Sequence, residues 1–490
     1  MPDDPSLEDG VRAIREGMPC SVSLPAGCGK TELIAAVVAA TAADGGTALV
    51  LTHTHAGVDA LRRRMAKFEV PRDQVVVRTI DSWAFDLISH FPLLAELDVP
   101  PSPDWNRSAE YHRGAATAAQ SQAVRKMLRL SYDMVLVDEY QDCLIDQHGL
   151  VVAVAQAVPT TVLGDPLQSL FNFGGNQPVD WAIHVLPTFP LVEVDYRPRR
   201  WPENEALGTW LVEIRENLLQ GRPIDFSTAP IALVRRDDAR TFVRVCFRAL
   251  KLDGAVAVLG QFRNDCVSAA SNLQGTYSVM EAIDEKVPAK LASTIDTKPA
   301  AQVAKALVDF AINASAGLAG HIPSAKRVRL GNGQTFTTTK DELKSAYAAI
   351  NNVRSKVSPT AIRAALTEIA ALPGVTIHCR EAWYEVTRSI AVAETDDCTV
   401  AEALLLTRNH ARVAGRRPSD RIVTRPLLAK GLEYDHVVIL DPSRYSAQEL
   451  YVALSRGARS VTVIAESPVL AARRMAGGSP EESVPPIRAS

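Results

Sequence analysis

One short segment of the chain combines glycines, a lysine and a threonine in a pattern that can hold a phosphate chain. Glycines let backbone N–H groups close around phosphate oxygens, and the helix-like run that follows would direct the positive end of its dipole to the same place. Lys30 is expected to reach the β- and γ-phosphates of a nucleoside triphosphate, and the Thr31 hydroxyl to bind Mg²⁺. The residues predicted to line the nucleotide here are Pro25, Ala26, Gly27, Cys28, Gly29, Lys30, Thr31 and Glu32.

The alternative for this segment is a glycine-rich turn before a core helix. The strict phosphate-loop pattern has a glycine at position 24, where this chain has Leu24. The sequence Gly29-Lys30-Thr31 nevertheless follows an apolar strand-like run and precedes a helix-like run. This context favours a phosphate loop over an ordinary turn.

An acidic pair, Asp138–Glu139, follows another apolar run, Met134–Val137. An aspartate at the carboxyl end of a strand can hold Mg²⁺ through water, and the glutamate after it is placed to orient and deprotonate an attacking water molecule. A solvated acidic turn is the alternative, but the strand would direct the pair to the side of the sheet where the phosphate loop lies. Gln168, after a further strand-like run, could sense the γ-phosphate or its water, although ordinary turn residues explain it equally well.

Strands and helices must position these residues, and the sequence alternates short apolar runs with helix-like segments. This rhythm is typical of strand–helix units around buried parallel strands, so the predicted fold class is α/β. Two stretches, about 84–130 and about 270–385, are mostly helix-like and are interpreted as insertions into two nucleotide-binding domains. Within the second, Val328–Thr339 is predicted to form a hairpin around Gly331–Gly333. The apolar runs include Cys20–Leu24, Ala48–Leu51, Val75–Val77, Thr161–Leu163, Val256–Leu259, His436–Leu440 and Ser460–Ala465.

Length and composition narrow the class of protein. With 490 residues the chain should form about three or four domain-sized units. Its hydrophobic and charged contents are those of an ordinary globular protein, and with a net charge of -3 any path for DNA would have to be a local basic groove. The seven cysteines form no CxxC pair, which favours reduced thiols and a cytoplasmic protein. We expect no signal peptide and no membrane span.

Further segments resemble the motifs of superfamily 1A helicases of the UvrD/Rep type, in the order that the family has them. The sequence VDEYQD at 137–142 is close to motif II, and GDPLQSLFNF at 164–173 is similar to motif III. Asp195–Arg197 resembles motif IV, Ala429–Tyr434 motif V and Leu450–Arg456 motif VI. The combination of KGLEYDHVVI with ELYVALSR is far more specific than a phosphate loop alone.

The resemblance implies an ATP site shared between two RecA-like parallel-sheet domains of the P-loop NTPase fold, each with a mostly helical inserted subdomain. Tyr196 would stack on adenine, and Glu433 would contact the ribose. Arg197 and Arg456 would reach the γ-phosphate from the far domain and stabilise the transferring charge. The implied cofactors are ATP and Mg²⁺. The implied catalytic residues are Lys30, Glu139, Gln168, Arg197 and Arg456, and the implied metal ligands are Thr31 and Asp138.

The resemblance also implies a track for single-stranded DNA. Leu51–Thr54 and the helix after it resemble motif Ia, and Thr79–Ser82 resembles the next DNA-contacting motif. In the family an aromatic residue of motif III stacks on a DNA base, and Phe173 matches that position. The implied DNA contacts are Thr52, His55, Thr79, Ser82 and Phe173. A 3′→5′ polarity of translocation follows from the family alone.

Several positions depart from the family's pattern, mostly along the DNA track. No glutamine lies upstream of the phosphate loop to read adenine, so selectivity for ATP over other nucleotides stays open. His55–Ala56 replaces an Asn–Lys pair, Asp81 a histidine, Gly174 an arginine and Leu427 another histidine. The ATP machinery is therefore better kept than the DNA track. Both insertions are also short beside those of repair helicases, which predicts weak or partner-dependent unwinding.

The predicted organisation has two interrupted domains and a tail. The first RecA-like domain spans 1–83 and 131–190 around an insertion at 84–130; the second spans 191–270 and 386–476 around an insertion at 271–385; residues 477–490 form a disordered tail.

The expected function is an ATP-dependent DNA helicase or translocase acting on single-stranded DNA or a tailed duplex. The compact size is similar to that of the helicase subunit of the Gabija anti-phage system, which works beside an OLD-family nuclease, and this analogy implies such a nuclease as partner. A stand-alone repair or recombination helicase is the main competitor. A different class also stays open: an NTP-driven subunit that recruits or licenses a nuclease, with little translocation of its own.

Overall fold

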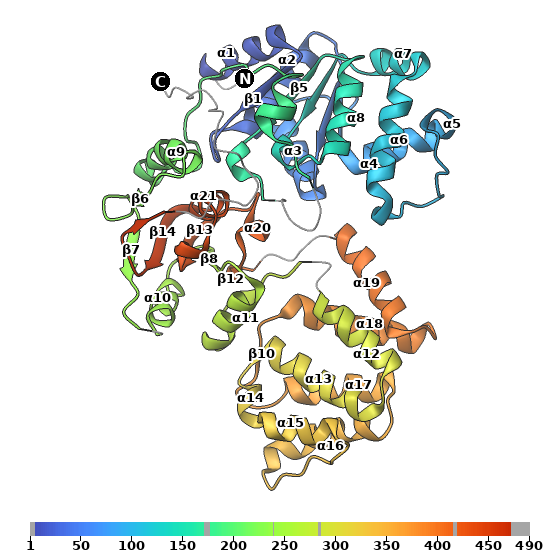
Figure 1. Cartoon of the computed structure of the whole chain (residues 1–490), viewed down its shortest axis with the longest axis vertical. Coiled ribbons are helices and arrows are strands. Elements are labelled where there is room, and N and C mark those ends of the chain that lie inside the picture. The colour runs from blue at the N-terminus through green and yellow to red at the C-terminus, as the bar shows by residue number, and fades with distance from the viewer. Residues whose placement is uncertain (1–4, 171–176, 239, 283–285, 415–418, 472–490) are drawn as a thin grey trace. The chain divides into compact units, whose positions relative to one another are not determined.

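The computed structural model describes residues 5–170, 177–238, 240–282, 286–414 and 419–471. Its contacts divide the chain into two compact units, which we describe separately. The first unit consists of Met1–Ile224, Ser446–Ser455 and Ala471–Ser490, and the second of Asp225–Tyr445 and Arg456–Leu470. Figure 1 shows both units, with elements labelled where there is room.

A five-stranded parallel sheet forms the centre of the first unit, with the strand order β1-β5-β4-β2-β3. The carboxyl ends of parallel strands meet at one edge of a sheet, which is where ligands bind in such folds. Because β5 lies between β1 and β4, the segments that follow these three strands are neighbours at that edge. The strands are β1 (Cys20–Ser23), β2 (Ala48–Thr52), β3 (Val75–Thr79), β4 (Met134–Val137) and β5 (Thr160–Gly164).

Apolar side chains on the two faces of this sheet belong to two separate core clusters. Along β2, Leu49 and Leu51 pack into one cluster, and Ala48 and Val50 into the other. Burial on both faces explains why the strands are almost continuously apolar rather than alternating. The helices that supply the rest of the two clusters include α1 (Pro5–Gly17), α2 (Lys30–Ala43), α3 (His55–Lys67) and α8 (Ile145–Ala155); α9 (Glu205–Leu219) and α21 (Ala447–Leu454) complete the unit.

The segment between β3 and β4 is helical. Its helices are α4 (Ile80–His90), α5 (Pro92–Ala95), α6 (Ser108–Gln120) and α7 (Gln122–Ser131). Phe85 of α4 packs edge-on against Tyr111 of α6, with ring centroids 5.2 Å apart. Small residues of α6, among them Ala115 and Ala118, are fully buried against the neighbouring helices.

A six-stranded sheet forms the second unit's α/β part, with the order β7-β14-β13-β8-β12-β9. All its pairings are parallel. Two parallel sheets with helical insertions confirm the predicted α/β class and are consistent with two RecA-like domains. The strands are β7 (Ala232–Arg235), β8 (Val256–Leu259), β9 (Ser278–Val279), β12 (Arg421–Thr424), β13 (Tyr434–Leu440) and β14 (Gly457–Ala465); α10 (Thr241–Ala249), α11 (Arg263–Asn272) and α20 (Pro426–Ala429) connect them.

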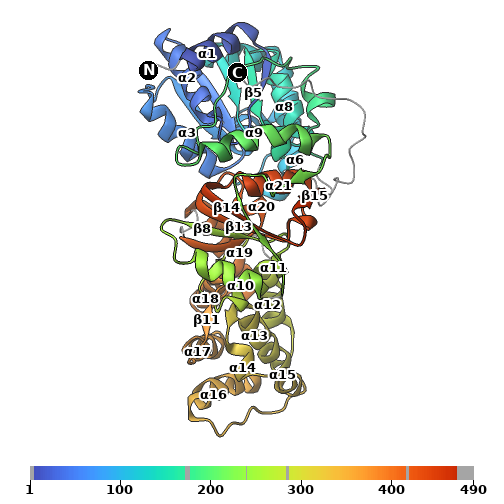
Figure 2. The same ribbon diagram turned by 90° about the vertical axis from the view of Figure 1, so that its left-hand side faces the viewer.

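The chain between β9 and β12 is almost entirely helical, and these helices pack on one another beside the short strands β10 (Ser315–Ala316) and β11 (Thr376–Ile377) (Figure 2). The helices are α12 (Lys286–Thr297), α13 (Ala300–Ala314), α14 (Leu318–His321), α15 (Ser324–Gly331), α16 (Asp341–Ser355), α17 (Pro359–Ala370), α18 (Arg380–Thr395) and α19 (Val400–Ala414). A further two-stranded sheet pairs β6 (Ile224–Asp225) with β15 (Val469–Leu470).

The hairpin predicted over Val328–Thr339 is wrong. Helix α15 runs to Gly331, and Gly333 in the left-handed region ends the helical turn with no returning strand. The Asn351 side chain explains the difference: its amide accepts a hydrogen bond from the Phe336 backbone N–H and donates one to the Phe336 carbonyl, each at 2.9 Å. A side chain from α16 therefore satisfies the backbone groups that a partner strand would have paired.

The division into compact units differs in position from the predicted domain boundaries, which stay predictions. Residues 191–224, including α9, and the helix α21 fall in the first unit. The predicted disordered tail, 477–490, lies outside the described residues. Among the residues that are described, no helix is long and apolar enough to cross a membrane.

Candidate nucleotide site

The segment between β1 and α2 has the backbone of a phosphate loop. Gly27 and Gly29 have φ angles of 69° and 87°, in the left-handed region that favours glycine. Helix α2 begins at Lys30, directly after Gly29, so its free N–H groups face the loop. Leu24 is buried, has no positive φ and donates its N–H to the Gly164 carbonyl. This conformation suits leucine, so the departure from the strict pattern leaves the loop intact.

Lys30 lies against the acidic pair that follows β4. Its Nζ is 2.8 Å from Glu139 Oε1 and 3.5 Å from Asp138 Oδ1. Glu139 has a φ of 55°, an uncommon backbone conformation for a non-glycine residue that occurs preferentially at functional sites. The structure thus brings together the three side chains that the sequence assigned to phosphate, to Mg²⁺ and to the attacking water.

Burial and charge shape the acid–base properties of this cluster. Burial raises the pKa of Asp138, an effect that the neighbouring Lys30 opposes. Burial alone would lower the pKa of Lys30, but the carboxylates of Glu139 and Asp138 outweigh it, and the pKa is raised. Lys30 therefore carries its charge at any physiological pH, as a phosphate-binding lysine must.

Gln141 connects the acidic pair to the segment after β5. Its Nε2 donates to Glu139 Oε2 at 2.5 Å, and its Oε1 accepts from the Asp165 backbone N–H at 2.9 Å. Gln168 donates through Nε2 to Asp165 Oδ2 at 2.9 Å. The predicted sensor, Gln168, is therefore buried beside Asp165 and is linked to Glu139 through backbone and side-chain hydrogen bonds.

The residues that directly follow the motif IV-like segment pack on the phosphate loop. The backbone N–H groups of Arg199 and Arg200 lie 2.8 and 3.2 Å from the Gly27 carbonyl. Trp201 is buried, and a Cβ at Gly27 would come within 2.8 Å of its ring. The Arg199 side chain lies close to Gly29. A Cβ added at Gly29 would be 3.1 Å from both Cδ and Nε of Arg199.

Two sequence-predicted residues of this segment lie differently from each other. Tyr196 is largely buried in the same apolar cluster as Cys28, and burial raises the pKa of its hydroxyl. Arg197, which the resemblance assigned to the γ-phosphate from the far domain, is exposed and falls in the first unit, together with the phosphate loop. Their contacts with nucleotide stay predictions.

Glu433 and Arg456 belong to the second unit and are described only within it. Glu433 is exposed, while Arg456 is buried and donates to the Leu432 carbonyl at 3.1 Å. The Arg456 carbonyl accepts from the Tyr434 N–H at 3.0 Å, so motifs V and VI are bonded to each other. Their roles at ribose and γ-phosphate stay predictions.

The predicted DNA contacts are mostly engaged in local structure. Thr79 is buried and caps α4 by accepting from the Ser82 N–H at 3.1 Å, and the Ser82 hydroxyl donates to the Thr79 carbonyl. Thr52 is buried and His55 is exposed at the start of α3. Phe173 lies outside the described residues.

The Asp81 carboxylate is hydrogen-bonded to two side chains of the first unit. His112 Nε2 and Gln147 Nε2 lie 2.8 and 2.9 Å from Asp81 Oδ1. Burial would raise the pKa of this carboxyl, but the bonds from His112 and Gln147 outweigh it and the pKa is lowered. The position at which the resemblance would place a histidine thus holds a carboxylate that is hydrogen-bonded within the first unit.

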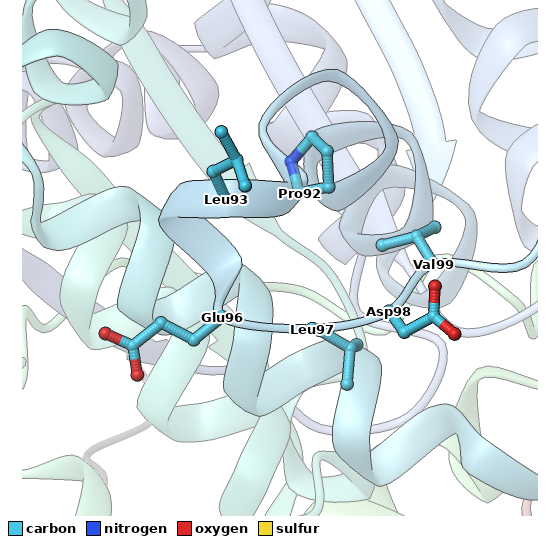
Figure 3. Close-up of a pocket in the computed structure, with 6 residues that line it drawn as sticks. All are labelled: Pro92, Leu93, Glu96, Leu97, Asp98 and Val99. Carbon is cyan, nitrogen blue, oxygen red and sulfur yellow. The ribbon is translucent and has the colours of Figure 1, made fainter.

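A pocket elsewhere in the first unit does not coincide with these residues. It is lined by Pro92, Leu93, Glu96, Leu97, Asp98 and Val99, around helix α5 (Figure 3). Neither the phosphate loop nor the acidic pair contributes to it, so it is not the nucleotide site.

Comparison with known families bears on the first unit. Residues 8–174 match a family model described as an AAA domain, AAA_19, a P-loop domain typical of superfamily 1 UvrD-like helicases. This range contains the phosphate loop, the acidic pair and the GDPLQ segment. The chain therefore contains a P-loop NTPase domain. No curated protein matches the chain.

The residues of this NTPase domain fit Mg²⁺ and a nucleoside triphosphate. Thr31 and Asp138 offer hard oxygen donors, and Mg²⁺ usually takes one or two protein ligands together with substrate phosphates and water. In the described part of the chain, no group of three or more His, Cys, Asp or Glu side chains could hold a metal by itself. A metal held jointly by the protein and the phosphates agrees with both observations.

Sequence reasoning missed several residues of the site. Gln141, Asp165 and Tyr451 lie inside the motif-like segments, but the sequence assigns no role to any of them. Arg215 had no signal, since nothing in the pattern of α9 marks one arginine as buried. Only the burial and hydrogen bonds of the folded chain reveal it.

Proposed function

We propose that the protein is an ATP- and Mg²⁺-dependent motor of UvrD-like type, which couples hydrolysis to 3′→5′ movement on single-stranded DNA. The observation that carries the NTPase part is Lys30 held between Asp138 and Glu139 beside a phosphate loop. The order of motifs II to VI along the chain supports the DNA-motor part.

The side chains at the site have distinct tasks in this proposal. When bound, Mg–ATP supplies the phosphoanhydride bond and the cation that neutralises its charge. Lys30 would exchange its contact with Glu139 for phosphate oxygens, which leaves Glu139 to accept a proton from the attacking water. Gln141 would keep that carboxylate oriented through its bond to Oε2.

Two arginines are candidates for stabilising transferring charge from the first unit. Arg197 matches the motif position, whereas Arg199 is the one whose side chain runs along Gly29 of the phosphate loop. Separate Arg197→Ala and Arg199→Ala variants distinguish them. Removing the arginine that stabilises the transferring charge should lower kcat by about 10²-fold or more. Arg456, from motif VI, is proposed as the second arginine.

The decisive measurement is nucleotide hydrolysis with and without single-stranded DNA, over all four NTPs. A motor predicts strong stimulation by single-stranded DNA and no turnover by Lys30→Ala. Absence of hydrolysis of every NTP by the purified wild type would overturn the NTPase assignment. Similar turnover of all four NTPs would agree with the missing upstream glutamine.

The DNA track has its own test. Phe173→Ala should weaken binding of single-stranded DNA by about 1–3 kcal/mol if the ring stacks on a base. Fluorescence anisotropy with a labelled oligonucleotide measures this, and unchanged affinity would remove Phe173 from the track. Unwinding of a tailed duplex, measured alongside, should be weak for the protein alone.

A second candidate function is an NTP-driven subunit that recruits or licenses a nuclease. The bonding of Asp81 to His112 and Gln147 favours it, because that motif position then presents a negative charge, not a donor, to DNA phosphates. An OLD-family nuclease in anti-phage defence is the proposed partner, and DNA repair or recombination the competing role. This candidate predicts that hydrolysis is stimulated mainly by the partner nuclease, and the genes adjacent to this one would identify that partner.

A further inference from the structure

A buried arginine lies behind the nucleotide site, on helix α9. Arg215 is almost fully buried, and its guanidinium NH1 lies 2.8 and 2.9 Å from the two carboxylate oxygens of Asp165, which is fully buried. An unpaired charge in such a place would be strongly destabilising, so this pair must be kept together in the folded chain.

The same guanidinium nitrogen reaches a third group. It donates to the Tyr451 hydroxyl at 3.0 Å, and the Arg215 guanidinium carbon lies 5.2 Å from the centroid of the Tyr451 ring. Tyr451 is a fully buried residue of α21, the helix that carries most of the motif VI-like sequence. Arg215 therefore fixes the place of both an acidic residue after β5 and a tyrosine from near the C-terminus.

The Tyr451 hydroxyl also accepts the backbone N–H of Ala26 at 3.0 Å. Ala26 belongs to the first turn of the phosphate loop, next to Gly27. Both lone pairs of the hydroxyl oxygen are then used, one by the loop and one by Arg215. The phosphate loop is thus hydrogen-bonded to α21 through a single atom, the Tyr451 hydroxyl oxygen.

At its other end the network reaches the residues that would meet the γ-phosphate. Asp165 Oδ2 accepts from Gln168 Nε2 at 2.9 Å, and the Asp165 N–H donates to Gln141, which in turn donates to Glu139. Hydrogen bonds therefore run without a break from the phosphate loop, through Tyr451, Arg215 and Asp165, to Gln168.

We propose that Arg215 and Tyr451 are positioning residues of the nucleotide site, which hold the first turn of the phosphate loop and the Gln168 side chain in one fixed relation. The proposal rests on the NTPase function proposed above. As a consequence, the Tyr451 hydroxyl would transmit a change in the bound phosphates to α21. This helix carries the start of motif VI. Neither residue touches nucleotide in this account.

Tyr451→Phe is the sharpest test, because it keeps the ring and removes only the hydroxyl. The Ala26 N–H then loses its acceptor, and we expect the KM for ATP to rise about five- to tenfold, as for loss of one well-placed hydrogen bond. Tyr277→Phe is the matched control. Tyr277 is equally buried, and its hydroxyl donates to the Cys246 carbonyl at 2.8 Å in the second unit. It should lower Tm similarly and leave KM unchanged.

Arg215→Lys supplies a second variant that keeps the charge. A lysine ammonium can pair with Asp165, but its side chain is shorter and lacks the planar group that lies over the Tyr451 ring, so it should not hold Asp165 and Tyr451 in the same places. We expect a similar rise in KM, and a Tyr451→Phe/Arg215→Lys double variant whose KM exceeds that of either single variant by less than twofold, because both changes break one network.

Three results are distinguished by measuring ATP hydrolysis and binding of a fluorescent ATP analogue on folded protein. If wild-type protein neither binds nor hydrolyses NTPs, the proposed function fails. If wild-type protein is active and both single variants keep KM and analogue affinity within twofold of wild type, the positioning role is overturned. If the KM increases of the two single variants multiply in the double variant, the single connected network is likewise overturned, even where each variant alone is impaired.

Discussion

Two buried clusters in the first unit each pair a cation with carboxylates, and they are built differently. Arg215 makes three short hydrogen bonds to Asp165 and Tyr451, all of them closed off from solvent. Lys30 makes one short contact, to a Glu139 side chain that is 31% exposed, and a longer one to Asp138. A planar guanidinium presents its N–H groups in fixed directions, whereas an ammonium is a point charge that can change partners. Arg215 is therefore a fixed cation, which keeps its partners Asp165 and Tyr451. Lys30 is an exchangeable cation, which can leave Glu139 for another partner.

Removing the exchangeable cation should have the largest effect on rate. Lys30→Ala deletes the charge that the phosphates need, so we expect hydrolysis to fall by about 10³-fold or more, to the level of a protein-free blank. A phosphate-release assay measures this. Because Glu139 can turn to solvent, the variant should remain folded by circular dichroism, and near-normal turnover would remove Lys30 from the site.

Neutralising its partner should separate binding from turnover. Glu139→Gln keeps the size of the side chain and one acceptor oxygen but cannot accept a proton, so kcat should fall by about 10²–10⁴-fold. Binding of a fluorescent ATP analogue should stay close to wild type, and ATP should be trapped on the protein. A fall in affinity equal to the fall in kcat would argue against a role as general base.

Removing the fixed cation should instead cost stability. Arg215→Ala leaves Asp165 buried without its partner, so the free energy of unfolding should fall by about 3–5 kcal/mol. Arg113, which pairs with Asp146 at 2.8 Å on the surface, is the matched control. Arg113→Ala should cost less than about 1 kcal/mol. Equal effects of the two changes, measured by urea denaturation, would erase the distinction between the clusters.

The smallest effect is expected at Gln141, which links the two clusters by hydrogen bonds to Glu139 and Asp165. Gln141→Leu leaves the Asp165 N–H without its acceptor, which should lower the free energy of unfolding by about 1–3 kcal/mol and kcat by about tenfold. Gln147→Leu is the control. Gln147 is also buried with two hydrogen bonds, to Leu144 and Asp81, outside the nucleotide site. It should lose similar stability with kcat unchanged; an equal fall in kcat would assign Gln141 to packing alone.

The same contrast shows what the sequence could and could not predict. The exchangeable cluster was predictable because contiguous residues set its backbone: Gly27, Gly29 and Lys30 specify a loop, and Asp138–Glu139 ends an apolar strand. The fixed cluster was not, because Asp165, Arg215 and Tyr451 meet only through the fold. Likewise the turn signal at Gly331–Gly333 was present, but the Asn351 amide that replaces a partner strand comes from another helix.

The bond between Ala26 and Tyr451 joins residues that lie 425 positions apart in the chain. A ribosome releases the phosphate loop long before it makes α21, so the newly made N-terminal part folds without the hydroxyl that holds its loop. The nucleotide site is thus finished by a segment that is synthesised long after the loop itself. Chains that lack α21 should carry a phosphate loop whose first turn is not yet secured, and nascent protein should bind ATP more weakly until α21 has been made.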